Sequence, residues 1–450
     1  MAEIAPLTPL RYDLSRVPGG LGTIIAPPYD VISPEERAVL AARDPHNVVH
    51  LILPEGEGDA KYAHAGQLFA KWQAERVLVR DDAPGFYRLD QRFVPPGGDA
   101  GAPKLLRRGF LALVRLVPFS ARVVLPHERT LSGPKEDRLK LFRATRANLS
   151  PGFMLYRDAR GELAPALAEA EPIAETRTAD GVEHALAKIR RPEAVRAIVE
   201  GIARSTLLIA DGHHRYETAV RHAEEVSAAH AGAGPRAEHR FFMTFLVNGD
   251  DPDLVVFPTH RHVHSLASFS FDALLRDVRA LFEVQELPQG ADAPAILAAL
   301  SRAGSRGPSV AAASRDGRAA VLTLRAEGRD NLLEAHPTLG RQPAVLRRTD
   351  VTLLHTGILE PVLGITPAAQ AAKTNLWYPQ NAASALAELR GGKGDVLFLM
   401  NATPVAQVRS VAEAGEVMPQ KSTFFYPKVP TGLAIHTLDP ERSIGAYGEP

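Results

Sequence analysis

The sequence predicts an α/β or α+β protein built from mixed sheets and helices, and three observations support this class. Short apolar runs alternate with segments of helical spacing along all 450 residues. Hydrophobic residues make up 45% of the chain, which suits a fully buried core. No repeat of fixed period interrupts the alternation. The length exceeds the ~150 residues of an ordinary domain and therefore indicates several lobes.

The first expected helix lies over residues 34–43. Ser33 is a natural N-cap, Pro34 suits the first helical position, and Glu36 completes a capping box. The helix should end before Pro45, because proline disfavours helical backbone in the residue that precedes it.

A second helix over 62–75 is followed by a predicted β-hairpin. Apolar residues recur at helical spacing in this helix. The segments 85–94 and 105–117 both have extended character, and the Pro- and Gly-rich segment 95–103 between them suits a hairpin loop. We therefore expect the two strands to pair within one domain.

The middle of the chain carries a basic segment over 122–146, with a surplus of four positive charges in a chain of no net charge. Its second half is expected to form a helix from about Pro134 to Arg146. Further along, we expect a helix over 192–203, an apolar strand that ends near Asp211, an amphipathic helix after it, and a strand over 241–247.

The last third again mixes both element types. The expected elements are a helix over 271–281, a hairpin over 309–324 that turns at Asp316-Gly317, a helix over 350–359, a strand over 396–400, and a helix with Thr403 as N-cap and Pro404 in its first turn. We expect three regions: an N-terminal α/β region over 1–120, a core over 121–266 and a C-terminal α/β region over 267–450.

Composition excludes several classes of function. Lys and Arg together number 52, and so do Asp and Glu, so the chain lacks the positive field of a general nucleic-acid or membrane-surface binder. Cysteine is absent, which excludes disulfides, thiolate nucleophiles and zinc–cysteine sites. The N-terminus shows no signal peptide, and no apolar run reaches the ~18 residues of a membrane span. We expect a soluble, cytoplasmic protein.

The strongest candidate for a functional site is a turn between a strand and a helix. Its residues are Asp211, Gly212, His213, His214 and Arg215. The start of a helix presents backbone N–H groups at the positive end of the helix dipole, which favours anions. The glycine permits close backbone approach, the arginine offers a fork for phosphate, and the histidines add donors. The carboxylate suits an N-cap or a ligand of Mg²⁺. A capped helix with solvated polar residues is the alternative interpretation.

A second candidate is the segment PHERT, which precedes the basic helix. Glu128 is flanked by His127 and Arg129, so its carboxylate should stay ionised and suits a general base or a metal ligand. His127 is the second catalytic candidate, and a surface salt bridge is the alternative interpretation. In the helix that follows, Lys135 and Arg138 are expected to raise the local concentration of anions.

A third candidate is the pattern H-x-H-x-H at His260, His262 and His264. In an extended segment the three side chains point to one face, an arrangement that suits the zinc ion of a hydrolase. An edge strand with solvated histidines is the alternative interpretation. In the tail, Lys421 and Lys428 are placed to close over an anion. No P-loop, dinucleotide-binding fingerprint or nucleophile elbow is present.

Five segments in this order resemble a family of bacterial and archaeal proteins called domain of unknown function 1015. They are PPYDVIS, PHERTLSGPKEDRLKLFRATRANLSP, ADGHHRYETA, FPTHR and MPQKSTFFYPK, and they extend from residue 27 to residue 428. The DGHHR turn also resembles the phosphate-binding turn of the ParB/sulfiredoxin superfamily. In the free-serine kinases of that superfamily, a histidine-rich turn holds nucleotide phosphate and an earlier glutamate acts as base.

The resemblance implies a ParB/sulfiredoxin-like core with additional N- and C-terminal α/β lobes. It also implies that Asp211, His213, His214 and Arg215 hold phosphate and that Glu128 is the base. We therefore expect a nucleotide-dependent phosphotransferase that uses ATP or ADP with Mg²⁺ and acts on a small hydroxyl compound such as free serine. Asp211 is the candidate ligand of the metal. The alternatives are the zinc-dependent hydrolase and a nucleotide-binding regulatory or nucleic-acid-binding module, in which the basic segment would contact nucleic acid.

Overall fold

The computed structural model describes residues 1–96, 102–130, 132–326 and 329–445, and its contacts divide the chain into two compact units. The first unit comprises Met1–Pro126, Thr130–Val255 and the chain from Phe425 onward, and the second comprises His127–Arg129 and Val256–Phe424. The three regions expected from the sequence stay a prediction, because this grouping reflects packing and does not test which regions fold alone.

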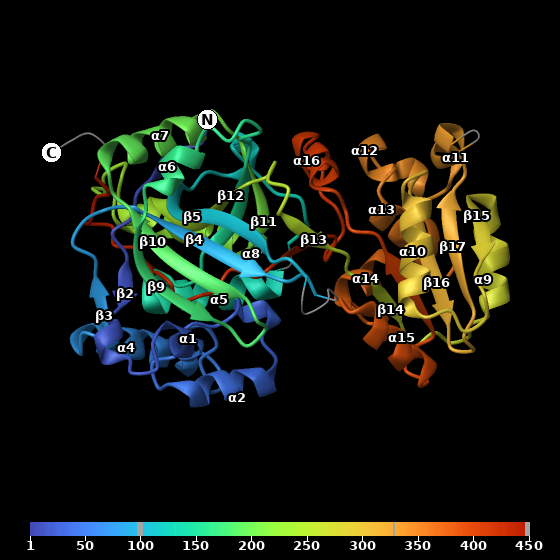
Figure 1. Ribbon diagram of the computed structural model, residues 1–450, viewed down its shortest axis with the longest axis horizontal. Coiled ribbons are helices and arrows are strands. Elements are labelled where there is room, and N and C mark those ends of the chain that lie inside the picture. The colour runs from blue at the N-terminus through green and yellow to red at the C-terminus, as the bar shows by residue number, and fades with distance from the viewer. Residues whose placement is uncertain (97–101, 131, 327–328, 446–450) are drawn as a thin grey trace. The chain divides into compact units, whose positions relative to one another are not determined.

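A nine-stranded mixed sheet forms the centre of the first unit (Figure 1). Its strands are β1 Ile4–Ala5, β4 Phe86–Phe93, β5 Leu105–Arg115, β6 Val124–Leu125, β8 Gly152–Tyr156, β9 Glu171–Arg177, β10 Glu183–Ile189, β11 Leu207–Asp211 and β12 Phe241–Asn248. They lie in the order β6-β11-β8-β12-β5-β4-β10-β9, and β1 pairs with β5 beside this path. The pairs β6–β11 and β8–β12 are parallel, and the other pairs are antiparallel.

Helices and two short antiparallel ladders complete the first unit. The ladders join β2 Leu10–Tyr12 to β3 Leu78–Arg80 and β7 Ala147–Asn148 to β21 His436–Thr437. The helices are α1 Leu21–Ile24, α2 Pro34–Arg43, α3 Val49–Ile52, α4 Ala60–Ala74, α5 Ser132–Thr145, α6 Ala164–Ala168, α7 Pro192–Ala203 and α8 His213–Ala229. One face of the large sheet packs against α6, α7 and α8, whose Leu167, Ile198 and Tyr216 join a single buried cluster with the strand residues Phe110, Ile209 and Phe242.

The second unit is built on a six-stranded antiparallel sheet in the order β15-β17-β16-β19-β14-β18. Its strands are β14 Arg261–Val263, β15 Phe282–Glu286, β16 Ser309–Ser314, β17 Ala319–Leu324, β18 Leu376–Trp377 and β19 Val396–Met400. Its helices are α9 Phe271–Asp277, α10 Ala293–Gly304, α11 Arg329–Ala335, α12 Ala344–Arg347, α13 Asp350–Leu354, α14 Pro367–Ala372, α15 Ala382–Arg390 and α16 Val405–Glu413. The strands β13 Val255–Phe257 and β20 Phe424–Tyr426 lie where the chain passes between the units.

Alternation along the strands builds the core of the second unit on both faces of its sheet. In β16, Val310 and Ala312 join the cluster formed with α9 and α13, whereas Ala311 and Ala313 join the cluster formed with α10 and α15. Successive side chains of a strand point to opposite faces, so an apolar run such as this requires cover on both sides.

The mixed α/β class expected from the sequence is confirmed, and most element ends are close to their expected positions. The helices α2 and α7 and the strand β19 have the expected bounds, and Ser33 accepts the expected N-cap hydrogen bond from the Glu36 N–H. The hairpin of β4 and β5 is confirmed, although residues 97–101 of its loop lie outside the described residues. None of the helices in the described ranges has the length and apolar character of a membrane span.

Two details of the expected helices are wrong. Thr403 is not the N-cap of α16, because Pro404 occupies that position in extended conformation. The helix expected over 350–359 changes character halfway: α13 ends at Leu354, and a π-helix continues over His355–Leu359.

Candidate functional site

The turn between β11 and α8 requires glycine at position 212. Gly212 is the N-cap of α8 and has a φ of 92°, in the left-handed region that glycine adopts without strain. A Cβ atom at this position would lie 3.0 Å from the Arg215 guanidinium. The expectation that Asp211 is the N-cap is wrong, because Asp211 is the last residue of β11.

Arg215 folds back beneath this turn and is almost completely buried. Its Nη2 atom lies 3.5 Å from Oδ2 of Asp211, and its Nη1 donates to the carbonyl of Pro151. The residue is 5% exposed. The guanidinium is therefore fixed beside the backbone of the turn and does not extend into solvent.

Two further cations lie close to Asp211. Nζ of Lys428 is 3.2 Å from Oδ2 of the same carboxylate. Arg107, on β5, is fully buried, and its Nε donates to Oε1 of Gln91 at 3.0 Å. Burial lowers the pKa of the Arg107 guanidinium to about 9, and the field of Asp211 acts against this shift. The Nη1 atom of Arg107 is buried and has no hydrogen-bond partner among the residues that the structure describes.

We call Arg107, Arg215, Lys428 and Asp211 the cation cluster. Its side chains carry three positive charges and one negative charge, and two of the cations are buried. Buried charge is unfavourable unless an opposite charge compensates for it. The start of α8 is the positive end of the helix dipole, so it adds further positive potential to the cluster. The arrangement suits an anion with more than one negative charge.

A small cavity beside the cation cluster brings further sequence motifs together. Tyr29, Arg138, Asn148 and Arg215 all contribute to its lining. The Arg138 guanidinium lies 4.1 Å from the centre of the Tyr29 ring and donates to the carbonyl of Ile52 at 2.8 Å. Burial raises the pKa of the Tyr29 hydroxyl. The segments PPYDVIS, ANLSP and DGHHR thus meet within the first unit.

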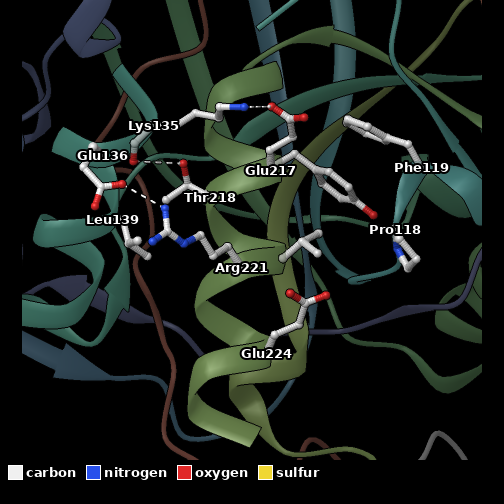
Figure 2. A pocket seen from close by; sticks show the side chains of 11 residues that line it. Pro118, Phe119, Lys135, Glu136, Leu139, Glu217, Thr218, Arg221 and Glu224 are labelled. Atoms are coloured by element: carbon white, nitrogen blue, oxygen red, sulfur yellow. Dashed lines mark hydrogen bonds and ion pairs between the residues drawn. The ribbon is translucent and has the colours of Figure 1, made fainter. Parts of the chain in front are cut away.

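Lys135 occupies a different cavity, although the sequence groups it with Arg138. Its Nζ lies 3.2 Å from Oε2 of Glu217, one helical turn along α8 from His213. Figure 2 shows this ion pair at the edge of a pocket between α5 and α8. The geometry therefore brings Arg138 to the cavity that Arg215 lines, and it does not bring Lys135 there.

His127 and Glu128 belong to the second unit, where the backbone of the MPQKST segment surrounds the carboxylate. Oε1 of Glu128 accepts from the N–H groups of Ser422 at 2.9 Å and Thr423 at 3.1 Å. Oε2 accepts from the N–H of Lys421 at 3.3 Å. Nε2 of His127 forms a 2.8 Å hydrogen bond with Oγ1 of Thr423. These contacts join PHERT to MPQKST, and a catalytic role of the two residues stays a prediction.

The three histidines of the H-x-H-x-H pattern do not form the expected zinc site. Nδ1 of His260 accepts from the Met400 N–H at 3.1 Å, and Nε2 of His262 bonds to the Lys393 carbonyl at 2.7 Å. The His264 ring stacks on Trp377 with 4.0 Å between the ring centres. Within the described ranges, no three His, Asp or Glu side chains gather closely enough to hold a metal ion. The expectation of solvated histidines is also wrong for His260 and His262, which are buried.

Sequence reasoning missed Arg107. The strand β5 reads LLRRGFLALVR, and Arg107 shares one face of it with Gly109, Leu111 and Leu113. The last two of these side chains are fully buried. The signal was therefore an arginine at an inward position of an apolar strand, a place where charge needs a partner.

The family described as Protein of unknown function (DUF1015) matches residues 4–352, more than half of the chain. The chain belongs to this family. The family resemblance carried by the five sequence segments is thus confirmed. A comparison with curated proteins gives no match.

Several solved structures are similar to this DUF1015 protein at low identity. A conserved hypothetical protein from Pyrococcus furiosus is 14% identical, over 70% of this chain and 92% of that chain, with a TM-score of 0.34. A free serine kinase in complex with AMP is 13% identical, over 71% of this chain and 89% of that chain, with a TM-score of 0.35. SbnI with a C-terminal truncation, from Staphylococcus aureus, is 11% identical, over 73% of this chain and 87% of that chain, with a TM-score of 0.34.

Proposed function

We propose that the first unit binds the phosphate groups of a nucleotide at the cation cluster, and that the protein transfers a phosphoryl group to a small hydroxyl compound. The observation that carries the proposal is the surplus of positive charge around Asp211, at the start of α8. Polyphosphate compensates for this surplus with several negative charges at once. The nucleotide is ATP or ADP with Mg²⁺, and free serine is the first hydroxyl compound to test.

Each member of the turn has a role in this proposal. Lys428 holds phosphate oxygen atoms, Arg215 adds positive charge from beneath the turn, and Gly212 lets the nucleotide approach the backbone at the positive end of α8. His213 and His214 add donors. The same positive groups stabilise the charge that develops as the phosphoryl group leaves, which is where most of the catalysis of phosphoryl transfer arises.

Asp211 has two roles in the proposed site. Its ion pairs orient Arg215 and Lys428 toward one point. Its second duty, as a ligand of the Mg²⁺ that accompanies the nucleotide, is a prediction from the sequence. A metal ion held there would neutralise part of the charge of the phosphate groups.

Calorimetric titration of ADP into the Lys428→Gln variant tests the binding step. Lys428 is partly exposed, so glutamine should fit its place, while a charge-assisted contact worth ~1.5–3 kcal/mol is lost. We expect affinity for ADP to fall by about tenfold to a hundredfold. Lys140→Gln is the matched control, because Lys140 also pairs with an aspartate, Asp59 at 2.6 Å, on the surface of the same unit. Equal affinity in both variants would refute the site.

The transfer step needs its own measurement. Protein incubated with ATP or ADP, Mg²⁺ and serine should yield a phosphate ester, which phosphorus NMR distinguishes from free phosphate. Nucleotide binding without any ester from a panel of small hydroxyl compounds would leave the binding site standing and would remove the phosphotransferase.

A further inference from the structure

A second cavity of the first unit lies apart from the cation cluster, between α5, α8 and the 3-10 helix Phe119–Ala121. Its volume of about 570 Å³ is within the range of small-molecule sites. None of the four cluster residues contributes to its lining. Figure 2 shows that side chains of α8 line the cavity along the helix. Pro118 and Phe119 lie on the other side of α8 from Glu136 and Leu139.

Most charges in this cavity are already paired. Arg221 extends toward Glu136, with 2.8 Å between the guanidinium and the carboxylate, and Lys135 pairs with Glu217 (Figure 2). Apart from Thr218 and Glu224, the remaining lining residues are Pro118, Phe119, Leu139, Tyr216 and Val220, which are apolar or aromatic. The Phe119 ring stacks on the ring of Tyr216, with 5.4 Å between the ring centres and 17° between the planes. Such a wall favours a planar apolar group.

An adjoining cavity of about 330 Å³ continues along α8. It shares Pro118, Val220 and Glu224 with the first cavity, and Arg240 contributes to its lining. Neither the Glu224 carboxylate nor the Arg240 guanidinium makes a hydrogen bond or ion pair within the described ranges, and Nε of Arg240 is buried. A buried donor without an acceptor is unfavourable by ~1–3 kcal/mol, so a ligand that satisfies it gains affinity.

We infer that the two cavities together bind an α-amino acid with a flat apolar side chain. Its carboxylate pairs with Arg240, its ammonium group pairs with Glu224, and its ring lies along Phe119 in the larger cavity. The two charges that lack partners are opposite in sign and line one cavity, as a zwitterion requires. Anions alone would meet the repulsion of Glu224, and cations alone would leave Arg240 unsatisfied. This site does not depend on the proposed phosphotransferase activity.

Calorimetry with L-tryptophan as the probe tests the inference on the full chain. We expect binding with a dissociation constant in the millimolar range or below. Tryptamine lacks the carboxylate, indole-3-propionate lacks the ammonium group and L-alanine lacks the ring, so each should bind at least tenfold more weakly than tryptophan. Equal binding of the three indole compounds would show that the charges do not contribute and would overturn the inference, as would the absence of tryptophan binding.

Two charge variants locate the site. Arg240→Gln and Glu224→Gln should each weaken tryptophan binding by at least tenfold. Neither residue has a partner to lose within the described ranges, so neither variant should lower the free energy of unfolding by more than ~0.5 kcal/mol. Arg196→Gln and Glu200→Gln are matched controls, because both residues are exposed on α7 and outside the two cavities. Tryptophan affinity that is unchanged in the two test variants, or reduced equally in the controls, would refute the site. Binding of ADP should be unaffected throughout.

Discussion

Glu128 and Arg215 are both largely buried and charged, but different partners hold them. Arg215 pairs with another side chain and one carbonyl, whereas Glu128 is held by three backbone N–H groups of one segment. A carboxylate with backbone donors on both oxygen atoms fixes the path of the chain that supplies them. Glu128 therefore anchors residues 421–423 whether or not it also acts in catalysis.

The variant Glu128→Gln separates these two duties. Glutamine keeps one acceptor oxygen for Ser422 and Thr423, but its amide nitrogen would face the Lys421 N–H, which leaves two donors opposed. We expect the free energy of unfolding of the second unit to fall by ~1–3 kcal/mol, measured by chemical denaturation.

Glu360→Gln is the control for this substitution, because Glu360 lies in the same unit and its carboxylate has no partner within the described ranges. Unchanged stability of the Glu128 variant would contradict the anchoring role. The rate of phosphoryl transfer by this variant, measured well below the unfolding temperature, tests whether Glu128 is the general base. A loss of ~10²–10⁴-fold there is the range expected for a missing general base.

At the scale of elements, the start of α8 depends on a single residue. Gly212→Ala would place a side chain in the left-handed region, at a cost of ~1–2 kcal/mol, and would press a Cβ atom against the Arg215 guanidinium. We expect thermal unfolding at a lower temperature together with weaker binding of ADP, because the Arg215 guanidinium must shift to make room for the Cβ atom.

Gly161→Ala is a control that separates the loss of stability from the loss of affinity for ADP. Gly161 also has a positive φ, of 67°, but no neighbouring atom of the described residues lies within 4 Å of its Cβ position. This control should lose similar stability and keep full affinity for ADP. If both variants bound ADP equally well, the position of Arg215 would not matter for the ligand.

Elements with local signals could be predicted from the sequence, and those that depend on distant contacts could not. The ends of α2 follow from Ser33 and Pro34, which act on their own backbone. The π-helix after α13 has no such signal, because its His355 is held by Arg261 and Gln370 from other elements. The inward position of Arg107 on an apolar strand was a local signal, but its contact with the Pro427 carbonyl, 320 residues along the chain, was not predictable.

At the scale of the whole molecule, the sequence motifs divide between two units that the order of the chain does not reveal. Tyr29, Arg138 and Arg215 come together in the first unit, whereas Glu128 and the residues that hold it lie in the second. Three residues, 127–129, enter the second unit between two long stretches of the first. No local pattern predicts such an exchange, because long-range hydrogen bonds determine it. The candidate residues were therefore identifiable from the sequence, but their grouping was not.

Stability of the whole molecule should fall steeply in weak acid because many histidines are buried. Burial lowers the pKa values of five of them to about 4, namely those of His184, His222, His239, His260 and His436, and that of His355 to about 3. Unfolding returns these groups to a pKa near 6.5. Between about pH 4 and 6.5 the unfolded chain then binds more protons, so stability rises with pH in this window and is lost as pH falls through it.

Within the described ranges, carboxyl groups whose pKa is raised by burial act in the opposite direction, namely those of Asp350, Glu238 and Asp251. Burial raises the pKa of Asp350 to about 6, so the folded state binds its proton first and gains stability as pH falls. Six histidines outweigh three carboxyl groups, since each group contributes up to about 1.4 kcal/mol per pH unit. We expect the unfolding midpoint, followed by circular dichroism, to drop continuously from pH 6.5 to pH 4.

The contribution of a single histidine can be measured in His222→Leu. His222 is buried, with its ring centre 5.6 Å from that of Phe142, so leucine suits its surroundings and removes one titrating group. The free energy of unfolding should then depend on pH less steeply, by up to one proton, or ~1.4 kcal/mol per pH unit. A slope equal to that of the original protein would show that His222 does not titrate on unfolding, and the acid sensitivity would then have to come from other groups.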